Sequence, residues 1–174
     1  FSRKIKTNME YDCKCLGTLG SGNHYVEINV NSENKCFVTV HSGSRNLGQK
    51  VCNYHQDIVH SNSKFDWDAF HKKANKIPKK VKGKQRKEEE DRIFNEMNSN
   101  LTVPYLENEK MYEYLIDMIF AQNYASLNRK IMIREIVEGM NQEYKKENMI
   151  ETIHNYIDFN KMILRKGAVS ADKD

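Results

Sequence analysis

Residues 24–40, HYVEINVNSENKCFVTV, carry the pattern of two strands separated by a turn. Apolar and polar side chains alternate through residues 24–30, which is the period of a half-buried strand. Residues 31–35 have the composition of a turn, and residues 36–40 are again apolar and rich in β-branched side chains. We therefore predict an antiparallel pair of strands joined by a short turn.

The segments outside this hairpin carry mostly helical patterns. Apolar residues recur three and four positions apart, and prolines and glycines separate the runs. These patterns predict helices over residues 45–60, 66–74, 88–97, 105–128 (opened by Pro104) and 130–144, and short strands over 154–159 and 162–164. The fold class is therefore α+β, with a mixed β-sheet core and a helical middle segment.

The chain starts at Phe1 rather than at a methionine and stops within a charged stretch. We therefore expect a piece of a longer protein, folded as a single partial domain over residues 1–174. The four cysteines fit free thiols in a reducing cytoplasm. No secretory signal and no apolar run of membrane-spanning length is visible, so we expect a cytoplasmic protein without a membrane partner.

Charge is distributed unevenly along the chain. The net charge of +4 permits nucleic acid as a partner without requiring it. Residues 72–87 are dense in lysine and arginine, whereas residues 88–91 are acidic. We interpret residues 72–92 as a basic and acidic insertion or loop, in which the basic residues 72–87 either help to hold nucleic acid or are simply solvated.

His24 and His41 are the first candidates for chemistry. Antiparallel pairing around a turn at residues 31–35 places them side by side at the open end of the hairpin. His24 is in phase with the apolar face and His41 is one residue out of phase, so a bulge or a twist at the strand end would be needed. From the hairpin alone, a hydrogen-bonded core histidine and a surface histidine are the better interpretation.

Three further motifs could contact phosphate. Residues 17–22, GTLGSG, could let backbone amides approach an anion, although a plain tight turn explains them as well. In residues 41–45, HSGSR, small residues precede a predicted helix and Arg45 offers a fork suited to phosphate, or Ser44 simply caps the helix. His154-Asn155 and residues 165–168, RKGA, are each weak alone.

Together these motifs resemble the RtcB family of RNA ligases. Their order and rough spacing agree with the family, and they span about residues 12–172. The matching stretches are GTLGSGNHYVE at 17–27, HSGSR at 41–45, AQNYASLNR at 121–129, HNY at 154–156 and RKGAVSA at 165–171. Tyr25, where the family usually has phenylalanine, and Leu164, where it often has histidine or threonine, are departures.

The resemblance implies an activity. RtcB enzymes join an RNA 3′-phosphate or 2′,3′-cyclic phosphate to a 5′-hydroxyl, with GTP as co-substrate and two manganese ions as cofactors. A histidine carries the guanylate before it passes to the RNA. The expected partners are therefore GTP and RNA, such as tRNA halves or broken RNA ends.

The resemblance also implies roles for individual residues of this chain. It assigns manganese to His24, His41 and His154, and phosphate contacts to Arg45 and Lys166. The family's aspartate, cysteine and nucleophilic histidine are expected outside this chain, so we expect the chain alone to be inactive. The residues expected near the guanylate are Asn23, His24, Tyr25, Val26, Glu27 and Asn155.

Two other functions remain open at this point. A catalytically incomplete module that binds RNA or a nucleotide would carry the same motifs. A zinc hydrolase that uses three histidines is a further alternative, but it explains neither the glycine-rich stretch nor RKGA.

Overall fold

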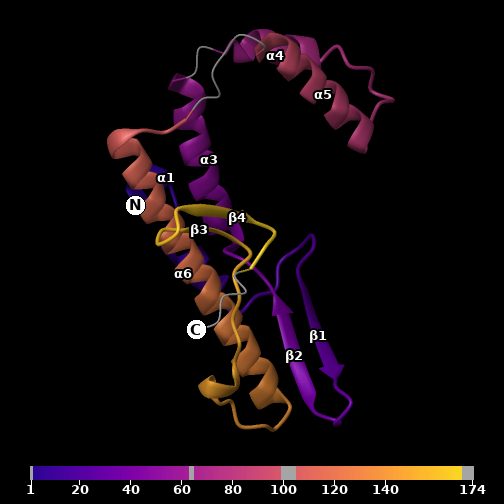
Figure 1. Cartoon of the computed structure of the whole chain (residues 1–174), viewed down its shortest axis with the longest axis vertical. Helices are drawn as coiled ribbons and strands as arrows, with labels where there is room; N and C mark the ends of the chain where they lie inside the picture. The colour runs from indigo at the N-terminus through magenta and orange to yellow at the C-terminus, as the bar shows by residue number, and fades with distance from the viewer. Residues whose placement is uncertain (1, 63–64, 99–104, 170–174) are drawn as a thin grey trace. The chain divides into compact units, whose positions relative to one another are not determined.

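The computed structural model describes residues 2–62, 65–98 and 105–169, and its helices and two small sheets confirm the α+β class (Figure 1). Pro104, which we expected to open the longest helix, lies outside the described residues. In chain order, the elements are α1 (Ser2–Ile5), α2 (Met9–Lys14), β1 (Tyr25–Val30), β2 (Cys36–His41), α3 (Arg45–Asn62), α4 (Trp67–Ala74), α5 (Gly83–Asn98), α6 (Asn108–Gly139), the short 3-10 helix η1 (Lys146–Asn148), β3 (Asn155–Asp158) and β4 (Ile163–Lys166).

The chain divides into two compact units. The first comprises Phe1–Leu16 and Gly43–Ala125, and the second comprises Gly17–Ser42 and Ser126–Asp174. Helix α6 contributes its first part to the first unit and its remainder to the second.

In the first unit, the core lies between helices. Ile5 of α1, Val51 of α3 and Ala121 of α6 are buried together, and Tyr54 packs against them. Burying a side chain of the size of Ile5 or Val51 stabilises a fold by roughly 1.5–3 kcal/mol. Where α3 meets α6, His55 is 2% exposed and its Nε2 lies 2.8 Å from Asp117 Oδ2. His55 is thus a packing residue.

In the second unit, β1 and β2 form the predicted hairpin. The register runs without interruption from Tyr25 opposite His41 to Val30 opposite Cys36. Asn31 closes the turn, because its Oδ1 accepts hydrogen bonds from the backbone N–H groups of Glu33 and Lys35. The bulge that we considered is therefore not needed.

The strands differ from our expectation in one respect. They form two separate antiparallel pairs, β1–β2 and β3–β4, and the described residues contain no mixed sheet that joins them. The apolar face of β1 is also open, with Ile28 55% and Val30 59% exposed. Alternation predicts which side chains share a face, but it does not say whether another layer covers that face.

Helix α6 corrects a second expectation. We predicted two helices here, over residues 105–128 and 130–144. The structure has one helix of 32 residues. Asn128 points inward and is fully buried, so these polar residues make tertiary contacts while the backbone continues as a helix.

Helix α5 corrects the boundary of the basic segment. We expected a loop up to residue 87, but the helix already begins at Gly83. Ion pairs one turn apart, Lys84 with Glu88 and Arg86 with Glu90, stabilise its first turns. The segment at 72–92 is therefore mostly helical, with a non-helical turn between α4 and α5.

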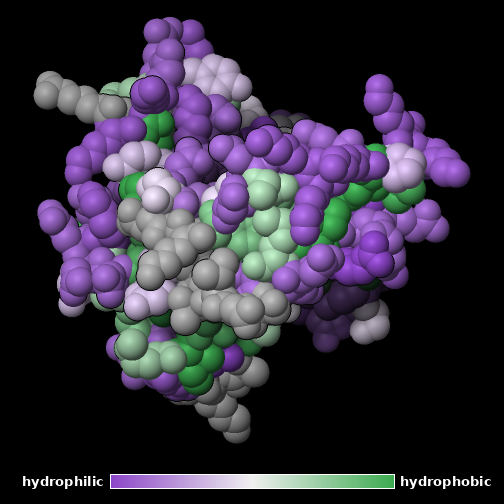
Figure 2. Space-filling model, turned by 90° about the horizontal axis from the view of Figure 1, so that it is seen from above, coloured by the Kyte–Doolittle hydropathy of each residue, from purple (hydrophilic) through white to green (hydrophobic). Residues whose placement is uncertain are grey.

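The surface view in Figure 2 shows hydrophilic residues around smaller hydrophobic groups. None of the described helices combines the length and apolar character that crossing a membrane requires. All four cysteines are free thiols.

Candidate functional site

The open end of the β1–β2 hairpin holds two of the three predicted histidines. His41 is the last residue of β2 and pairs with Tyr25, while His24 immediately precedes β1. The ring centroids of His24 and His41 are 6.0 Å apart, and those of Tyr25 and His41 are 5.3 Å apart. His24 precedes the paired residues of β1. The alternation of side chains along the strand therefore does not require the His24 and His41 rings to point to opposite faces.

His154 completes a group of three rings. It immediately precedes β3, and its ring centroid lies 5.4 Å from that of His41. His24 and His41 are half-buried and His154 is exposed. The second unit thus gathers three imidazoles from segments more than a hundred residues apart in the sequence.

The three rings can be tested against the requirements of a metal ion. Metal–nitrogen bonds of about 2 Å place the centroids of two ligating imidazoles roughly 5 Å apart. The pair of His41 and His154, at 5.4 Å, is close to this separation, and the pair of His24 and His41, at 6.0 Å, is slightly wider. Within residues 2–62, 65–98 and 105–169, no three His, Cys, Asp or Glu side chains are arranged to hold a metal ion. The three imidazole rings therefore place suitable metal donors close together, but the described residues do not form a complete metal site.

The β3–β4 hairpin brings together the last two motifs. Asn155 pairs with Lys166 across the strands. The side-chain oxygen of Asn155 accepts a hydrogen bond from the backbone N–H of Gly167 at 2.8 Å, and Ala168 N–H donates to the carbonyl of His154 at 3.1 Å. Gly167 has φ +68, which favours glycine. The HN and RKGA motifs therefore form one local structure beside the exposed His154.

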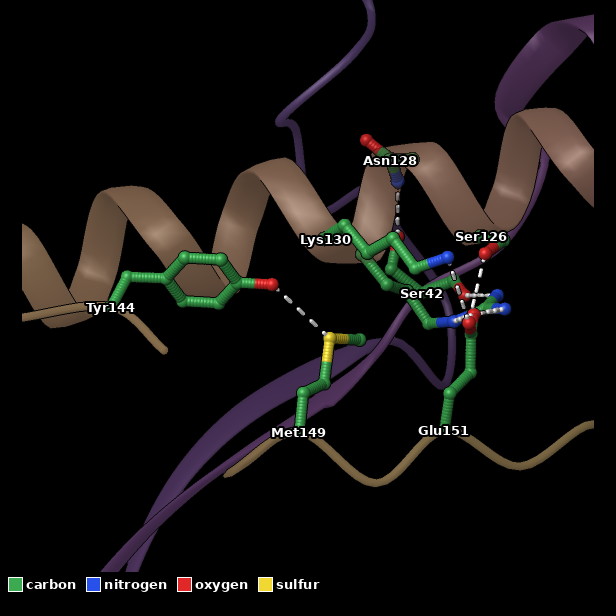
Figure 3. Close-up of polar contacts among 8 residues, drawn as sticks. Ser42, Ser126, Asn128, Lys130, Tyr144, Met149 and Glu151 are labelled. Atoms are coloured by element: carbon green, nitrogen blue, oxygen red, sulfur yellow. Dashed lines mark hydrogen bonds and ion pairs between the residues drawn. The ribbon is translucent and has the colours of Figure 1, made fainter. Parts of the chain in front are cut away.

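Asn128 is a positioning residue that sequence reasoning did not identify, although it lies in the AQNYASLNR motif. Its Oδ1 accepts from Thr18 N–H at 3.1 Å, and its Nδ2 donates to Thr18 O at 3.2 Å. The same Nδ2 donates to Ser42 Oγ at 3.0 Å (Figure 3). Ser42 Oγ in turn donates to Leu19 O at 2.8 Å. One buried amide thus connects α6 to the glycine-rich stretch and to the residue after His41.

The glycine-rich stretch also packs directly against α6. Gly17 has φ +75, and a Cβ added there would lie 2.9 Å from Cγ2 of Ile131. Nothing lies within 4 Å of the same position at Gly22. Close packing against α6 therefore requires a glycine at position 17, in agreement with the interpretation of this stretch as a tight turn. At Gly22, by contrast, a side chain would meet no neighbouring atom.

A second polar cluster lies next to Asn128 on α6. Arg129 donates its Nε to Glu151 Oε1 at 3.2 Å and its Nη1 to the Ser42 carbonyl at 3.1 Å. Ser126 Oγ donates to Glu151 Oε2 at 2.8 Å, and Lys130 Nζ lies 3.4 Å from the same oxygen (Figure 3). Burial raises the pKa of Glu151, but the hydrogen bonds from Arg129 and Ser126 and the charges of Arg129 and Lys130 bring it below its ordinary value. Glu151 is therefore held as a carboxylate that fixes the segment leading to His154.

The remaining predicted site residues lie as follows. Asn23 is exposed just before His24, and Val26 and Glu27 lie in β1 opposite Val40 and Thr39. Arg45 begins α3 in the first unit, with a φ of +55. The structure thus brings together the histidines, Tyr25, Asn155 and Lys166 in one unit, and Arg45 belongs to the other.

Comparison with known proteins decides the family. A family model described as tRNA-splicing ligase RtcB matches residues 2–174. The chain belongs to the RtcB family. This membership accounts for the five motifs and for their order along the chain.

The similar proteins are longer than this RtcB-family chain. The RNA-splicing ligase RtcB of Escherichia coli strain K12 is 26% identical over 186 aligned positions, which cover 98% of this chain and 38% of that protein. An RNA-splicing ligase RtcB homolog 1 of Entamoeba dispar is 38% identical over 60 positions, 26% of this chain and 11% of that protein. The chain thus spans about 38% of the length of the E. coli relative. No solved structure matches the chain.

Proposed function

We propose that the protein containing this chain is an RNA ligase that joins RNA 3′-phosphate or 2′,3′-cyclic phosphate ends to 5′-hydroxyl ends, using GTP and manganese. The observation that carries this proposal is the group formed by His24, His41 and His154, with ring separations of 6.0 and 5.4 Å, in a chain of the RtcB family. RNA ends from tRNA halves or from broken RNA are the proposed substrates.

The three histidines are the residues of this chain that would hold manganese. Neutral imidazole binds divalent transition metals, and aspartate and thiolate donors from elsewhere in the protein would complete the shell. When bound, the metal supplies positive charge that neutralises phosphate oxygens. This chemistry explains why imidazoles from three separate segments meet at one end of the hairpin.

Other residues of the chain would bind and orient the substrates. Lys166 is exposed on β4 and pairs with Asn155, the residue that follows His154. Its ammonium group can therefore reach a phosphate beside the histidines. Arg45 is proposed as a second phosphate contact. Residues 23–27 and Asn155 are proposed to contact the guanylate, and the nucleophilic histidine is proposed to lie outside this chain.

A binding module without catalysis is the second candidate. The described residues do not by themselves form a complete metal-ligand group, which is compatible with such a module and with a ligase whose other ligands lie elsewhere in the protein. Such a module would bind RNA or GTP but would give no joined product under any metal condition, so the same assay separates the two functions.

The decisive experiment uses the full-length protein and an RNA pair with one 3′-phosphate end and one 5′-hydroxyl end. Joined RNA should form only when GTP and manganese are both present. His41→Ala should abolish joining, because His41 contacts both other rings. His71→Ala is the matched control, because His71 is an exposed histidine of α4 in the other unit. Binding of RNA without joining would support the module instead.

A further inference from the structure

The turn between α4 and α5 is the part of the chain that the proposed ligase chemistry does not use. Residues 72–87 contain nine basic side chains and no acidic one. Four lysines lie in the non-helical stretch between Ala74 and Gly83, and all four are exposed. We name these residues the lysine turn: Lys76, Lys79, Lys80 and Lys82.

The backbone of the lysine turn is ordered. Lys76 N–H donates to Lys73 O at 3.0 Å, Ile77 N–H to Ala74 O at 3.1 Å, and Val81 N–H to Pro78 O at 2.9 Å. Ala74 is 6% and Ile77 9% exposed, so the chain is anchored by apolar burial on both sides of Asn75. The four ammonium groups are therefore presented from a fixed scaffold rather than from a flexible tail.

An aromatic cluster fixes the two helices that carry the turn. Phe65, which is 6% exposed, lies 4.7 Å from the Trp67 ring and 4.9 Å from the Phe94 ring of α5, between centroids. Phe70 of α4 lies 6.2 Å from Phe94. Because these rings contact one another in the interior of the pair, they serve packing and are not offered as stacking platforms for bases.

The basic residues of this segment fall into two groups. Lys73 lies 3.6 Å from Glu96, Lys84 lies 3.7 Å from Glu88, and Arg86 donates to Glu90 at 2.9 Å. These three basic side chains of the helices are thus paired with glutamates of α5. Within the described part of the chain, none of the four lysines of the turn makes an ion pair with an acidic side chain.

Uncompensated positive charge at one place is unfavourable for the protein alone. Ammonium groups that are close in space repel one another and raise the local potential. A polyanion with regularly spaced charges relieves this repulsion and releases its own counterions on binding. Lysine acts as a point charge on a long stem, which suits contact with phosphates and carries no information about base sequence.

We propose that the lysine turn, which belongs to the first unit, binds the phosphate backbone of RNA independently of sequence. This inference rests on the proposed function in one respect, that RNA is the polyanion the protein meets. An acidic protein surface is the competing partner, and the experiment below includes it.

The test measures binding of a fluorescent uridine oligomer to the full-length protein across a range of salt concentrations, without GTP or manganese. The turn variant is Lys79→Gln, Lys80→Gln and Lys82→Gln together. Its matched control is Lys14→Gln, Lys35→Gln and Lys145→Gln, which removes the same charge from lysines already paired with Glu10, Glu33 and Glu143.

The turn variant should bind on the order of tenfold or more weakly at low salt, and its slope of log K against log salt should be shallower by about 2. The control variant should change both quantities far less. The turn variant should also melt no earlier than the wild type, because it loses repulsion and no ion pair. Equal binding by the two variants would overturn the inference, and so would tighter binding of polyglutamate than of the RNA.

The same proteins separate this inference from the proposed ligase activity. Joining of RNA ends by the wild type, together with unchanged RNA binding by the turn variant, would overturn only the lysine turn. RNA binding that depends on the turn, in a protein that joins no ends with GTP and manganese, would support the turn and overturn only the ligase proposal.

Discussion

The side-chain amide of Asn128 donates a hydrogen bond to Ser42 Oγ at 3.0 Å, although 86 residues separate the two in the sequence. Both are buried, and Asn128 is 0% exposed. Since Asn128 also pairs with both backbone groups of Thr18, it ties together three motifs of the RtcB family. Ser42 directly follows His41, so this contact helps to place the histidine group.

Replacing Asn128 should destabilise the second unit strongly. Asn128→Ala would remove the three hydrogen bonds of a fully buried side-chain amide, which costs about 2–4 kcal/mol in the free energy of unfolding. Urea denaturation of the full-length protein measures this loss. Asn123→Ala, at an exposed position of the same helix, is the control. Equal effects of the two substitutions would contradict the role of Asn128.

Glu151 should make the stability of the protein depend on pH. Its folded-state pKa is below its ordinary value of 4.5, so its stabilising effect is complete above that value and is lost as the pH falls through the folded pKa. Glu151→Gln should lower the free energy of unfolding by about 1 kcal/mol at pH 7. It should also lose less stability than the wild type on acidification.

The control for this pH dependence is Glu147→Gln, since Glu147 is an exposed residue of η1. Denaturation curves at neutral and acidic pH should be the same for this variant as for the wild type. If Glu151→Gln showed the full acid loss of the wild type, then Arg129 and Ser126 would not be holding a carboxylate.

The histidine group should bind manganese more tightly than the rest of the chain. Calorimetric titration of the full-length protein with Mn²⁺ should show an affinity on the order of tenfold lower or worse after His24→Ala, His41→Ala or His154→Ala, because each removes one donor. His71→Ala should leave the affinity unchanged. An unaltered titration for all three variants would remove these residues from the metal site.

The 174-residue chain alone should not form a covalent guanylate. Its other histidines, His55, His60 and His71, lie outside the motifs of the family. His55 is also buried against Asp117, and the His60 ring lies 4.2 Å from Trp67. Intact-mass analysis after incubation with GTP and manganese should show no adduct, whereas the full-length protein should gain one. An adduct on any histidine of this chain would falsify the proposed assignment of roles.

Sequence alone located the two hairpins, within a residue or two, and most of the helices. Those predictions succeeded because a strand pair with a short turn, such as Tyr25–Val30 with Cys36–His41, depends on contacts between residues close in the chain. The same local geometry placed His24 beside His41. The family's motifs added His154, which no periodicity could have joined to the hairpin.

Only the tertiary structure decided which polar residues turn inward. The sequence shows Asn128 and Arg129 as a polar interruption, and local propensity cannot distinguish a helix break from a helix whose amide satisfies a distant loop. That distinction depends on Thr18, Ser42 and Glu151 lying next to α6. The sequence therefore determined the elements and the family of this chain. Packing between distant segments determined that α6 is continuous and that one buried amide connects it to two other motifs. It also determined which lysines of the basic segment are paired with glutamates and which are not.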